Sequence, residues 1–222
     1  MEHFDGKSDS VTINLDYQDK RYIYRGSKRI FDFLASLLGL IVLLPLFLIV
    51  SIAIKIEDPR GPIFYSQIRL GKKQAPFKMY KFRSMVVDAD KHLKDLLNKN
   101  EVDGAMFKMK DDPRITRIGH FIRKYSIDEL PQLLNVLLGN MSLVGPRPPL
   151  PREVQEYTEY DKQRLEVKPG CTGLWQISGR NNVGFHEMVE LDLKYINKRG
   201  FMFDLYVLFK TVFIFIKPNG AY

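Results

Sequence analysis

The chain has 222 residues, of which 45% are hydrophobic and 27% are charged, so it is neither a disordered chain nor a multi-pass membrane protein. This length predicts one domain with its own core. The formal net charge of +8 predicts partners that carry negative charge, namely nucleic acid, an anionic membrane surface or a phosphorylated substrate. The single cysteine, Cys171, excludes an internal disulfide and a cysteine-based zinc site.

The N-terminal region combines a polar tail with a hydrophobic run. Residues 1–27 are polar and predict a loosely held tail. Residues 33–54 contain no charged side chain, and as a helix they would extend about 33 Å, against about 30 Å for the core of a bilayer. Both flanks of this run are basic, which favours the cytoplasmic side for each end, and Pro45 near its middle favours a bend. These features leave a re-entrant hairpin and a single spanning helix equally favoured.

Shorter elements are predicted after the hydrophobic run. Two apolar and aromatic runs, Ile63–Leu70 and Pro76–Met85, predict a β-hairpin. The alternation of apolar and polar residues slips after Met79, which allows a bulge there. Apolar residues at helical spacing over Val86–Leu97 predict an amphipathic helix, and the polar residues 100–112 predict a loop.

Three further helices are predicted towards the C-terminus. Ile118–Tyr125 and Leu130–Leu138 have helical patterns. The apolar run Phe201–Ile216 is interrupted by Asp204 and Lys210, so it is too short and too charged to span a bilayer. Two alternatives remain open for it: a helix lying at a membrane interface, or a buried core helix.

A pair of acidic residues precedes one of these helices. Residues 126–129 have the S-x-x-E form of a capping box, and Pro131 follows where a first-turn proline is tolerated. Asp128 and Glu129 would then lie at a helix N-terminus, where the helix dipole lowers the pKa of a carboxylate and attracts phosphate. The simpler alternative is that both acids only cap the helix.

Basic residues occur in two segments that could serve the same site. Pro146, Arg147 and Pro148 predict a stiff loop that presents a planar cation, which can bind phosphate or stack on a base. The alternative is a rigid connector with a solvated arginine. Lys81 and Arg83 could face either substrate phosphates or lipid headgroups.

Five segments together resemble, in order and spacing, the bacterial sugar transferases. These are the monotopic phosphoglycosyl transferases, which begin exopolysaccharide or capsule synthesis by moving a hexose-1-phosphate onto a polyprenyl phosphate. The resemblance extends from about Lys28 to Pro218. It is carried by the segments Tyr80–Met85 (YKFRSM), Asp128–Gln132 (DELPQ), Asn140–Ser142 (NMS), Gly145–Pro148 (GPRP) and Lys168–Gly173 (KPGCTG).

The resemblance implies a particular architecture. We expect a helix-rich α+β fold: a single membrane-anchored catalytic domain with a re-entrant N-terminal helix and a short β-hairpin. The expected organisation is a polar tail at 1–27, a re-entrant membrane helix at 28–56 kinked at Pro45, and a catalytic domain at 57–222 with interfacial C-terminal helices. The expected location is the cytoplasmic face of the bacterial cell membrane. No multi-pass region precedes the anchor, so we expect the catalytic module to stand alone.

The resemblance also implies a chemistry. Asp128 would be the nucleophile that attacks the β-phosphorus of a UDP-sugar, expels UMP and passes the sugar phosphate to undecaprenyl phosphate. Glu129 would support the site, and both acids would bind Mg²⁺. Arg123, with Lys81 and Arg83, would contact phosphate, and the loop formed by residues 146–148 would bind the uridine nucleotide. The expected partners are UDP-glucose or UDP-galactose, undecaprenyl (polyprenyl) phosphate and membrane lipid, with no nucleic acid.

The sequence departs from the family pattern at one position. The family usually has Gly-Asp-Met-Ser, whereas this chain has Asn140 in place of the aspartate. An asparagine offers Mg²⁺ an oxygen but no charge.

Gly170, Gly173, Gly179 and Arg180 are expected in a loop near the site. The rival functions are a non-enzymatic, membrane-attached basic interaction protein and a glycosyltransferase that releases UDP.

Overall fold

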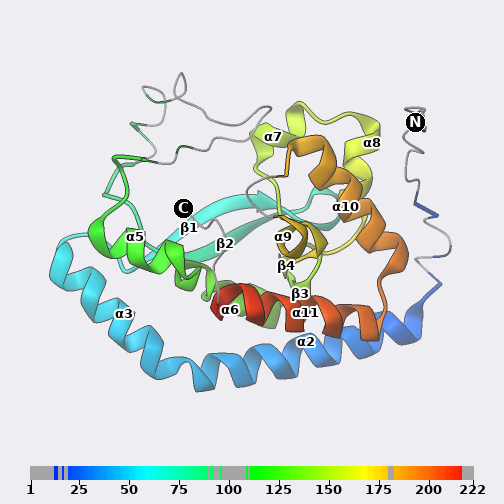
Figure 1. Ribbon diagram of the computed structural model, residues 1–222, viewed down its shortest axis with the longest axis horizontal. Helices are drawn as coiled ribbons and strands as arrows, with labels where there is room; N and C mark the ends of the chain where they lie inside the picture. Colours follow the sequence, from blue (N-terminus) through cyan, green and yellow to red (C-terminus); the bar gives the residue numbers. More distant parts are fainter. Residues whose placement is uncertain are drawn as a thin grey trace, which may run out of the picture.

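The computed structural model describes residues 13–14, 17, 20–89, 91–92, 96, 109, 111–179 and 183–216. Its α-helices are α2 (Tyr22–Val42), α3 (Leu44–Glu57), α5 (Arg117–Lys124), α6 (Gln132–Leu138), α7 (Pro151–Gln155), α8 (Glu159–Lys162), α9 (Leu174–Ser178), α10 (Phe185–Lys198) and α11 (Phe201–Ile216). The 3-10 helices are η1 (Lys72–Gln74), η3 (Ile127–Glu129) and η4 (Gln163–Glu166), and the strands are β1 (Phe64–Leu70), β2 (Pro76–Phe82), β3 (Ser142–Val144) and β4 (Gly170–Thr172). This helix-rich arrangement with a short hairpin confirms the predicted α+β class (Figure 1).

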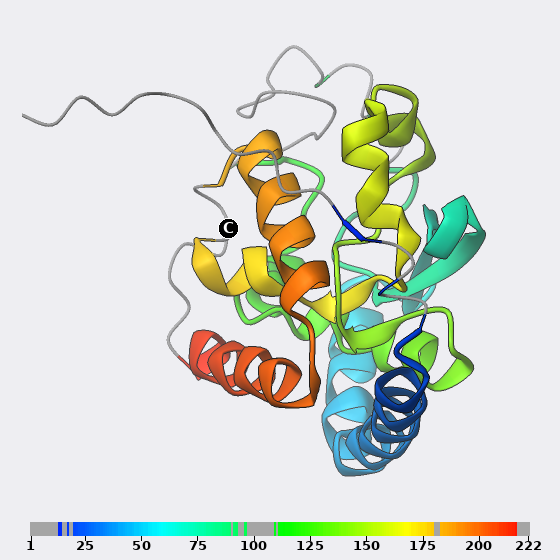
Figure 2. The same cartoon turned by 90° about the vertical axis from the view of Figure 1, so that its right-hand side faces the viewer.

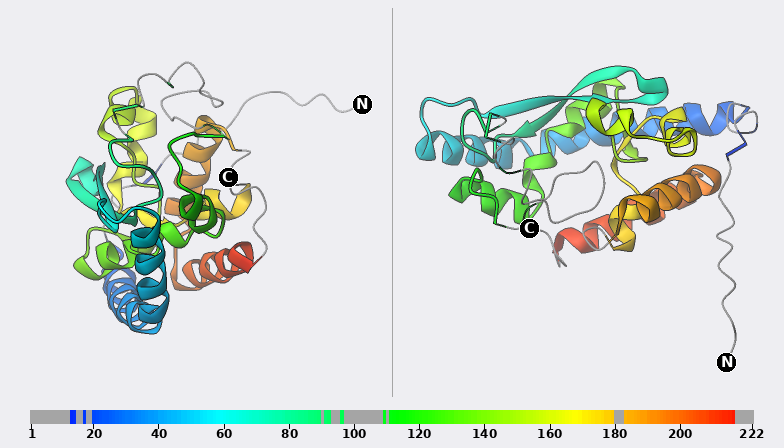
Figure 3. Two further views of the ribbon diagram at one scale, coloured as in Figure 1. Left: turned by 90° about the vertical axis from the view of Figure 1, so that its left-hand side faces the viewer. Right: turned by 90° about the horizontal axis from the view of Figure 1, so that it is seen from above.

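The hydrophobic run forms two helices joined by a sharp bend. α2 follows one long side of the molecule and α3 turns away from its end (Figures 1 and 3). The two helices meet at Leu43 and are bent by 58°. Pro45 lies in the first turn of α3, where a missing N–H leaves no intrahelical hydrogen bond unmade, so the bend predicted near this proline is confirmed. α2 begins at Tyr22, inside the segment predicted as a tail.

Of the helices in the described part of the chain, none is long and apolar enough to cross a bilayer by itself. The bent pair of α2 and α3 reaches that length and composition only when the two are taken together.

Polar contacts join α2 to the rest of the fold. Asp32 is buried, and its carboxylate accepts a hydrogen bond of 3.1 Å from the backbone N–H of Leu143 at β3. The Arg29 guanidinium donates to the carbonyl oxygens of Val136 and Leu137 at 2.6 and 2.9 Å. These two carbonyls lie at the C-terminal end of α6, where helix carbonyls lack intrahelical partners. α2 is therefore part of the domain as well as a candidate anchor.

The hairpin of β1 and β2 has a regular register. It runs without a break from the pair of Phe64 and Phe82 to the turn, so the bulge allowed after Met79 is absent from it. β2 ends at Phe82, earlier than predicted. Met85, in the predicted second strand, instead forms an isolated bridge with Ile115, which brings the segment after β2 beside the start of α5.

The helix predicted over Val86–Leu97 is not found at its start. Val87–Ala89 form a turn. Most of the remaining residues of this predicted helix, and most of the loop predicted at 100–112, lie outside the described residues.

Two apolar clusters hold the elements around the hairpin. Phe77 and Met79 of β2 pack against Val136 and Met141, so the hairpin lies on α6. A larger cluster surrounds α10 and includes Val144, Val167, Val189, Leu193, Tyr195, Ile196 and Val207. Between the two clusters, β3 and β4 form a parallel pair that the sequence did not predict.

α11 matches the predicted C-terminal helix, and part of it is buried as the core-helix alternative expects. Asp204 and Val207 are buried, whereas Met202 is 77% and Phe213 is 67% exposed. Figure 2 shows α11 and α2 along the same lower side of the molecule. One face of α11 therefore belongs to the core, and the other is exposed and apolar.

Candidate active site

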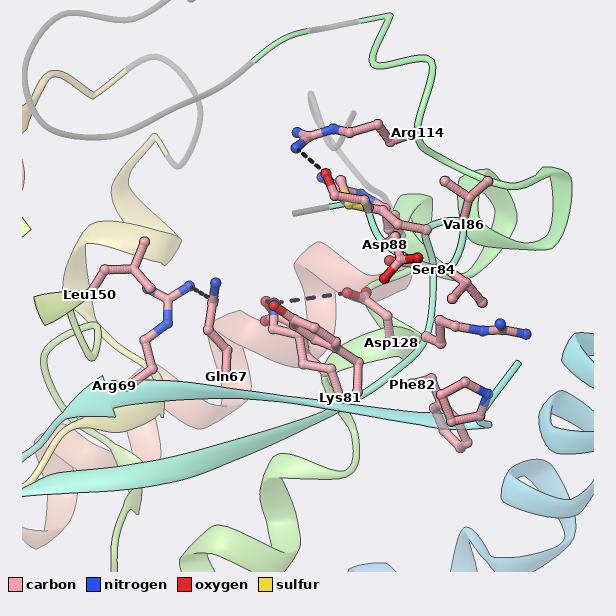
Figure 4. Close-up of a pocket in the computed structure, with 18 of the residues that line it drawn as sticks. Gln67, Arg69, Lys81, Phe82, Ser84, Val86, Asp88, Arg114, Asp128 and Leu150 are labelled. Atoms are coloured by element: carbon pink, nitrogen blue, oxygen red, sulfur yellow. Dashed lines mark hydrogen bonds and ion pairs between the residues drawn. The ribbon is translucent and has the colours of Figure 1, made fainter. Parts of the chain in front are cut away.

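One cavity gathers most of the predicted site residues. It has a volume of about 620 Å³ and is bounded by the hairpin, the segment that follows β2, η3 and α7 (Figure 4). Six predicted residues line it, namely Lys81, Arg83, Arg123, Asp128, Glu129 and Arg147. Pro146 and Pro148 lie outside its lining, and Pro45 is in the bent helix pair.

Asp128 reaches this cavity because of the turn that follows α5. Ser126 has a left-handed backbone with φ of 53°, which redirects the chain from α5 into η3. A non-glycine residue rarely adopts positive φ, and such strain is frequent at functional sites. The predicted capping box is wrong, since the Ser126 side chain makes no capping hydrogen bond and α6 begins only after Pro131. Asp128 therefore lies in a separate 3-10 turn, where it is 7% exposed.

Close contacts fix the helix that leads into this turn. A Cβ atom on Gly119 of α5 would lie 2.0 Å from the carbonyl oxygen of Ser84, so only glycine allows the segment after β2 to pass so close. Glu57, the last residue of α3, accepts hydrogen bonds of 2.7 and 3.0 Å from the first two backbone N–H groups of α5. The candidate anchor thus caps the helix before Asp128.

Burial sets the pKa of Asp128. Loss of solvent raises this pKa to about 6, the charge of Glu129 adds to the rise, and Lys81 and Arg123 act against it. The lowering expected from a helix N-terminus is therefore wrong in direction. The nearest cation is the Lys81 ammonium, 3.9 Å from the carboxylate. At neutral pH the carboxylate is still mostly ionised, as a nucleophile must be.

The two cations that act on Asp128, Lys81 and Arg123, are held differently. Lys81 forms an ion pair of 2.7 Å with Glu129 while it also faces Asp128 (Figure 4). Arg123 lies in the last turn of α5, and no described carboxylate lies at ion-pair distance from it. Arg123 is thus a cation of the cavity available to an anionic ligand.

Arg83 also lines the cavity, but its guanidinium is occupied. It forms an ion pair of 2.7 Å with Asp58 and is 6% exposed. A Cβ atom on Gly61 would lie 1.3 Å from its Nη1 atom, so the guanidinium lies directly against this glycine. This geometry favours a tether between the end of α3 and the end of β2 over a contact with phosphate or lipid.

The loop that carries Arg147 is fixed by its main chain. The carbonyl oxygen of Pro148 accepts a hydrogen bond of 3.1 Å from Arg69 on β1. The carbonyl oxygen of Pro146 accepts one of 2.9 Å from the N–H of Gly170 on β4. The two prolines therefore hold the backbone between β1 and β4, and the side chain of Arg147 lines the cavity.

Two buried acidic residues support this loop. Arg147 forms an ion pair of 2.9 Å with Glu153 of α7. Burial would raise the pKa of Glu153, but Arg147 and the backbone N–H of Leu150 hold it below its ordinary value. The Arg164 guanidinium, itself ion-paired with buried Asp192, donates to the carbonyl oxygen of Arg147 at 3.2 Å.

Sequence reasoning missed Arg69 and Glu153. A signal existed for Glu153, because Pro151 at the first position of a helix and a glutamate two residues later are typical of a helix start. Arg69 had none, since its environment depends on a loop 79 residues away. The glycine-rich loop expected near the site is instead β4 and α9, and Arg180 lies outside the described residues.

Asp128 and Glu129 fit a divalent cation. Two adjacent carboxylates face one cavity, and Mg²⁺ commonly uses one or two carboxylates together with substrate phosphates. Within the described ranges, no group of three or more acidic, histidine or cysteine side chains is arranged to hold a metal by itself. Asn140 follows α6, whereas Asp128 precedes it, and Asn140 is outside the cavity lining. The departure at Asn140 therefore leaves the carboxylates of the cavity unchanged.

Residues 23–218 match the bacterial sugar transferase family, and the chain belongs to that family. It is 45% identical, over its whole length, to the galactosyl transferase CpsE of Streptococcus agalactiae, and 42% identical over 96% of its length to an undecaprenyl-phosphate galactose phosphotransferase of Salmonella typhimurium. It spans only 48% and 44% of these two relatives. It is also 42% identical to the exopolysaccharide production protein ExoY of Sinorhizobium fredii, over 88% of each chain.

Proposed function

We propose that this protein transfers a hexose-1-phosphate from UDP-galactose or UDP-glucose to undecaprenyl phosphate and releases UMP. The observation that carries the proposal is the carboxylate of Asp128, which is buried, has a pKa of about 6 and faces a cavity lined by arginines and lysines. The names of the relatives, which refer to galactose, undecaprenyl phosphate and exopolysaccharide, support the same reaction.

Two displacements at phosphorus account for the reaction. In the first, an oxygen of Asp128 forms a bond to the β-phosphorus of the donor, and the bond from that phosphorus to the bridging oxygen breaks, with the electron pair leaving on UMP. In the second, a phosphate oxygen of the lipid attacks the same phosphorus, and the bond to Asp128 breaks. The carboxylate is regenerated, and one difficult step has become two easier ones.

The cations of the cavity bring negatively charged reactants together. Lys81 lies between Asp128 and Glu129, so it offsets the repulsion between an anionic nucleophile and a diphosphate. Arg123 can form an ion pair with the transferred phosphate. Arg147, which is held by Glu153, can contact the nucleotide. Asp128 and Glu129 would hold Mg²⁺, which supplies positive charge to the phosphate oxygens when bound. Arg83 acts as a tether to Asp58.

The membrane is the proposed place of this reaction. The bend of 58° between α2 and α3 supports a re-entrant pair that enters and leaves on the cytoplasmic face, because a lipid phosphate must reach Asp128 from that surface. The exposed apolar face of α11 beside α2 supports an interfacial position for this helix.

The test is to identify the nucleotide that is released. The full chain in lipid nanodiscs is mixed with UDP-galactose or UDP-glucose and undecaprenyl phosphate, and nucleotides are separated by chromatography. We expect UMP and a lipid diphosphate sugar. Release of UDP with a lipid monophosphate sugar would identify a glycosyltransferase instead, and no release with any UDP-hexose would favour a non-enzymatic interaction protein.

A further inference from the structure

The β1 wall of the cavity contains a buried cation to which the steps above assign no contact with substrate. Arg69 is 9% exposed, and its side chain rises from β1 on the same side as Gln67 (Figure 4). It donates to the carbonyl oxygen of Pro148 at 3.1 Å and to the side-chain oxygen of Gln67 at 2.8 Å. A guanidinium has five N–H donors, and among the described residues the buried Nε has no hydrogen-bond partner. Arg69 therefore has unused donor capacity.

The charges around Arg69 do not balance. Glu153 is buried and is paired at 2.9 Å with Arg147. Within the part of the chain that the structure describes, Arg69 has no ion pair of its own, and burial together with the charge of Arg147 lowers its pKa to about 10. Two guanidinium groups thus share one close carboxylate. A buried charge without a counter-charge is costly, and a bound anion would offset that cost.

This pair of cations belongs to the same cavity as the nucleophile. Lys81, which contacts the carboxylates of η3, is opposite Tyr65 in the hairpin. Arg69 lies four residues further along β1, at a backbone distance of about 13 Å. The charge of Glu129 nevertheless acts on both Arg69 and Arg147. An anion held by these two arginines would therefore lie in the same cavity as Asp128, further along the hairpin from Lys81.

We propose that Arg69, together with Arg147, binds the phosphate that remains on the nucleotide when UMP leaves. The inference rests on the proposed function, because that reaction generates UMP in this cavity. Gln67 fixes the plane of the Arg69 guanidinium by accepting one of its hydrogen bonds, and Pro148 fixes the loop to the same group. Arg69 is thus a donor-binding residue as well as a support for the loop.

The first test compares two ligands on the unmodified full chain in nanodiscs. UMP and uridine share the base and the ribose and differ only in the phosphate. By isothermal titration calorimetry, UMP should bind about 10- to 100-fold more tightly than uridine, the range that one or two charge-assisted hydrogen bonds supply. Equal affinities would overturn the proposal without any variant.

The second test uses Arg69→Gln, which removes the charge. We expect the affinity for UMP to fall about tenfold or more, whereas the affinity for uridine changes less than about threefold. An equal loss of affinity for both ligands would show that Arg69 only supports the loop. Unchanged affinity for UMP would show that Arg69 does not contact the phosphate. Either result overturns the proposal.

A matched control and a conservative variant accompany this test. Arg152→Gln removes a charge from an exposed arginine of the same cavity and should change UMP affinity less than about threefold. If Arg69→Gln does not fold, Arg69→Lys is used, which keeps the charge but loses the planar guanidinium with its paired donors. It should lower the affinity for UMP several-fold and leave the affinity for uridine unchanged. Failure of the proposed function would be seen in a different experiment, the nucleotide-release test, as release of UDP or of no nucleotide. That test does not depend on the affinity for UMP.

Discussion

Two acidic residues face the same cavity and are held in opposite ways. Glu153 is paired with Arg147 at 2.9 Å and accepts the N–H of Leu150 at 2.8 Å, and its pKa lies below the ordinary value. Asp128 is also buried, but its nearest cation is 3.9 Å away, and its pKa is raised to about 6. Burial is similar, so the close charge of Arg147 and the short hydrogen bonds to Glu153 make the difference.

The comparison separates a structural acid from the proposed nucleophile. The oxygens of Glu153 are engaged by donors, so this carboxylate balances charge and fixes a loop. Among the described residues, Asp128 has no ion pair shorter than the 3.9 Å contact with Lys81, and it is only 7% exposed. A carboxylate in that condition is poorly solvated and ready to form a bond to an electrophile.

Removing the proposed nucleophile should have the largest effect on catalysis. Asp128→Asn should lower UMP release at least about 1000-fold, because an amide does not attack phosphorus. Asp88→Asn is the matched control, since Asp88 lines the same cavity but its side chain is 55% exposed and pairs with Lys91. Turnover of Asp128→Asn at the unmodified rate would refute the assignment.

The same variant should gain stability. A carboxylate whose folded pKa is raised contributes stability that is present below its unfolded pKa of 3.8 and is lost as the pH rises through about 6. At pH 7.5, Asp128→Asn should therefore raise the free energy of unfolding by roughly 1 to 3 kcal/mol, as measured by denaturant titration. A loss of stability would contradict the raised pKa.

Removing the structural acid should instead destabilise the protein. Glu153→Gln leaves Arg147 and Arg69 without their close counter-charge, so the free energy of unfolding at pH 7.5 should fall by about 3 to 5 kcal/mol. The difference in the free energy of unfolding between the variant and the unmodified chain should become smaller in acid, because the ionised Glu153 stabilises the fold only above its lowered folded pKa. Glu156→Gln, at an exposed position on the same segment, should stay within about 0.5 kcal/mol.

The pH dependence sharpens the comparison further. The rate of the first displacement should fall about tenfold per pH unit below about 6 and level off above it, because only ionised Asp128 reacts. Lys81→Met should move this midpoint upwards, since Lys81 is the main group that lowers the pKa of Asp128. A rapid-quench pH profile measures both, and an unmoved midpoint in the variant would contradict the role of Lys81.

The smallest effect on the site is expected from the anchor. Pro45→Ala restores a backbone N–H in the first turn of α3, so the bend at Leu43 should straighten towards a spanning helix. Cysteines introduced at Gly26 and Arg60 report the two flanks by labelling in vesicles, and the chain with only the native Cys171 serves as the blank. In the unmodified chain both should be reached from one face. Unchanged labelling in the variant would show that Pro45 is not decisive.

Local patterns predicted part of this molecule well. The hairpin, α5, α11 and the bend beside Pro45 follow from periodicity and from proline chemistry, which act within a few residues. The motifs also placed Asp128, Glu129 and four basic residues in one cavity.

Tertiary contacts decided what the sequence did not predict. The pKa of Asp128 depends on burial by elements distant in the chain, so a helix-end argument gave the wrong direction. Arg83 is occupied by Asp58 and lies against Gly61, a contact that no spacing rule indicates. The position of Arg69 in the site is established only when the loop of Arg147 folds onto β1. The three-residue strands β3 and β4 are too short to leave a pattern.

The most direct test is to look for the bond between Asp128 and phosphorus. The full chain is mixed with UDP-galactose in the absence of the lipid acceptor, and its intact mass and the released nucleotide are measured. We predict one hexose phosphate added per chain, located on the peptide that contains Asp128, together with one equivalent of UMP. No adduct, with UMP appearing only once undecaprenyl phosphate is added, would contradict a covalent intermediate.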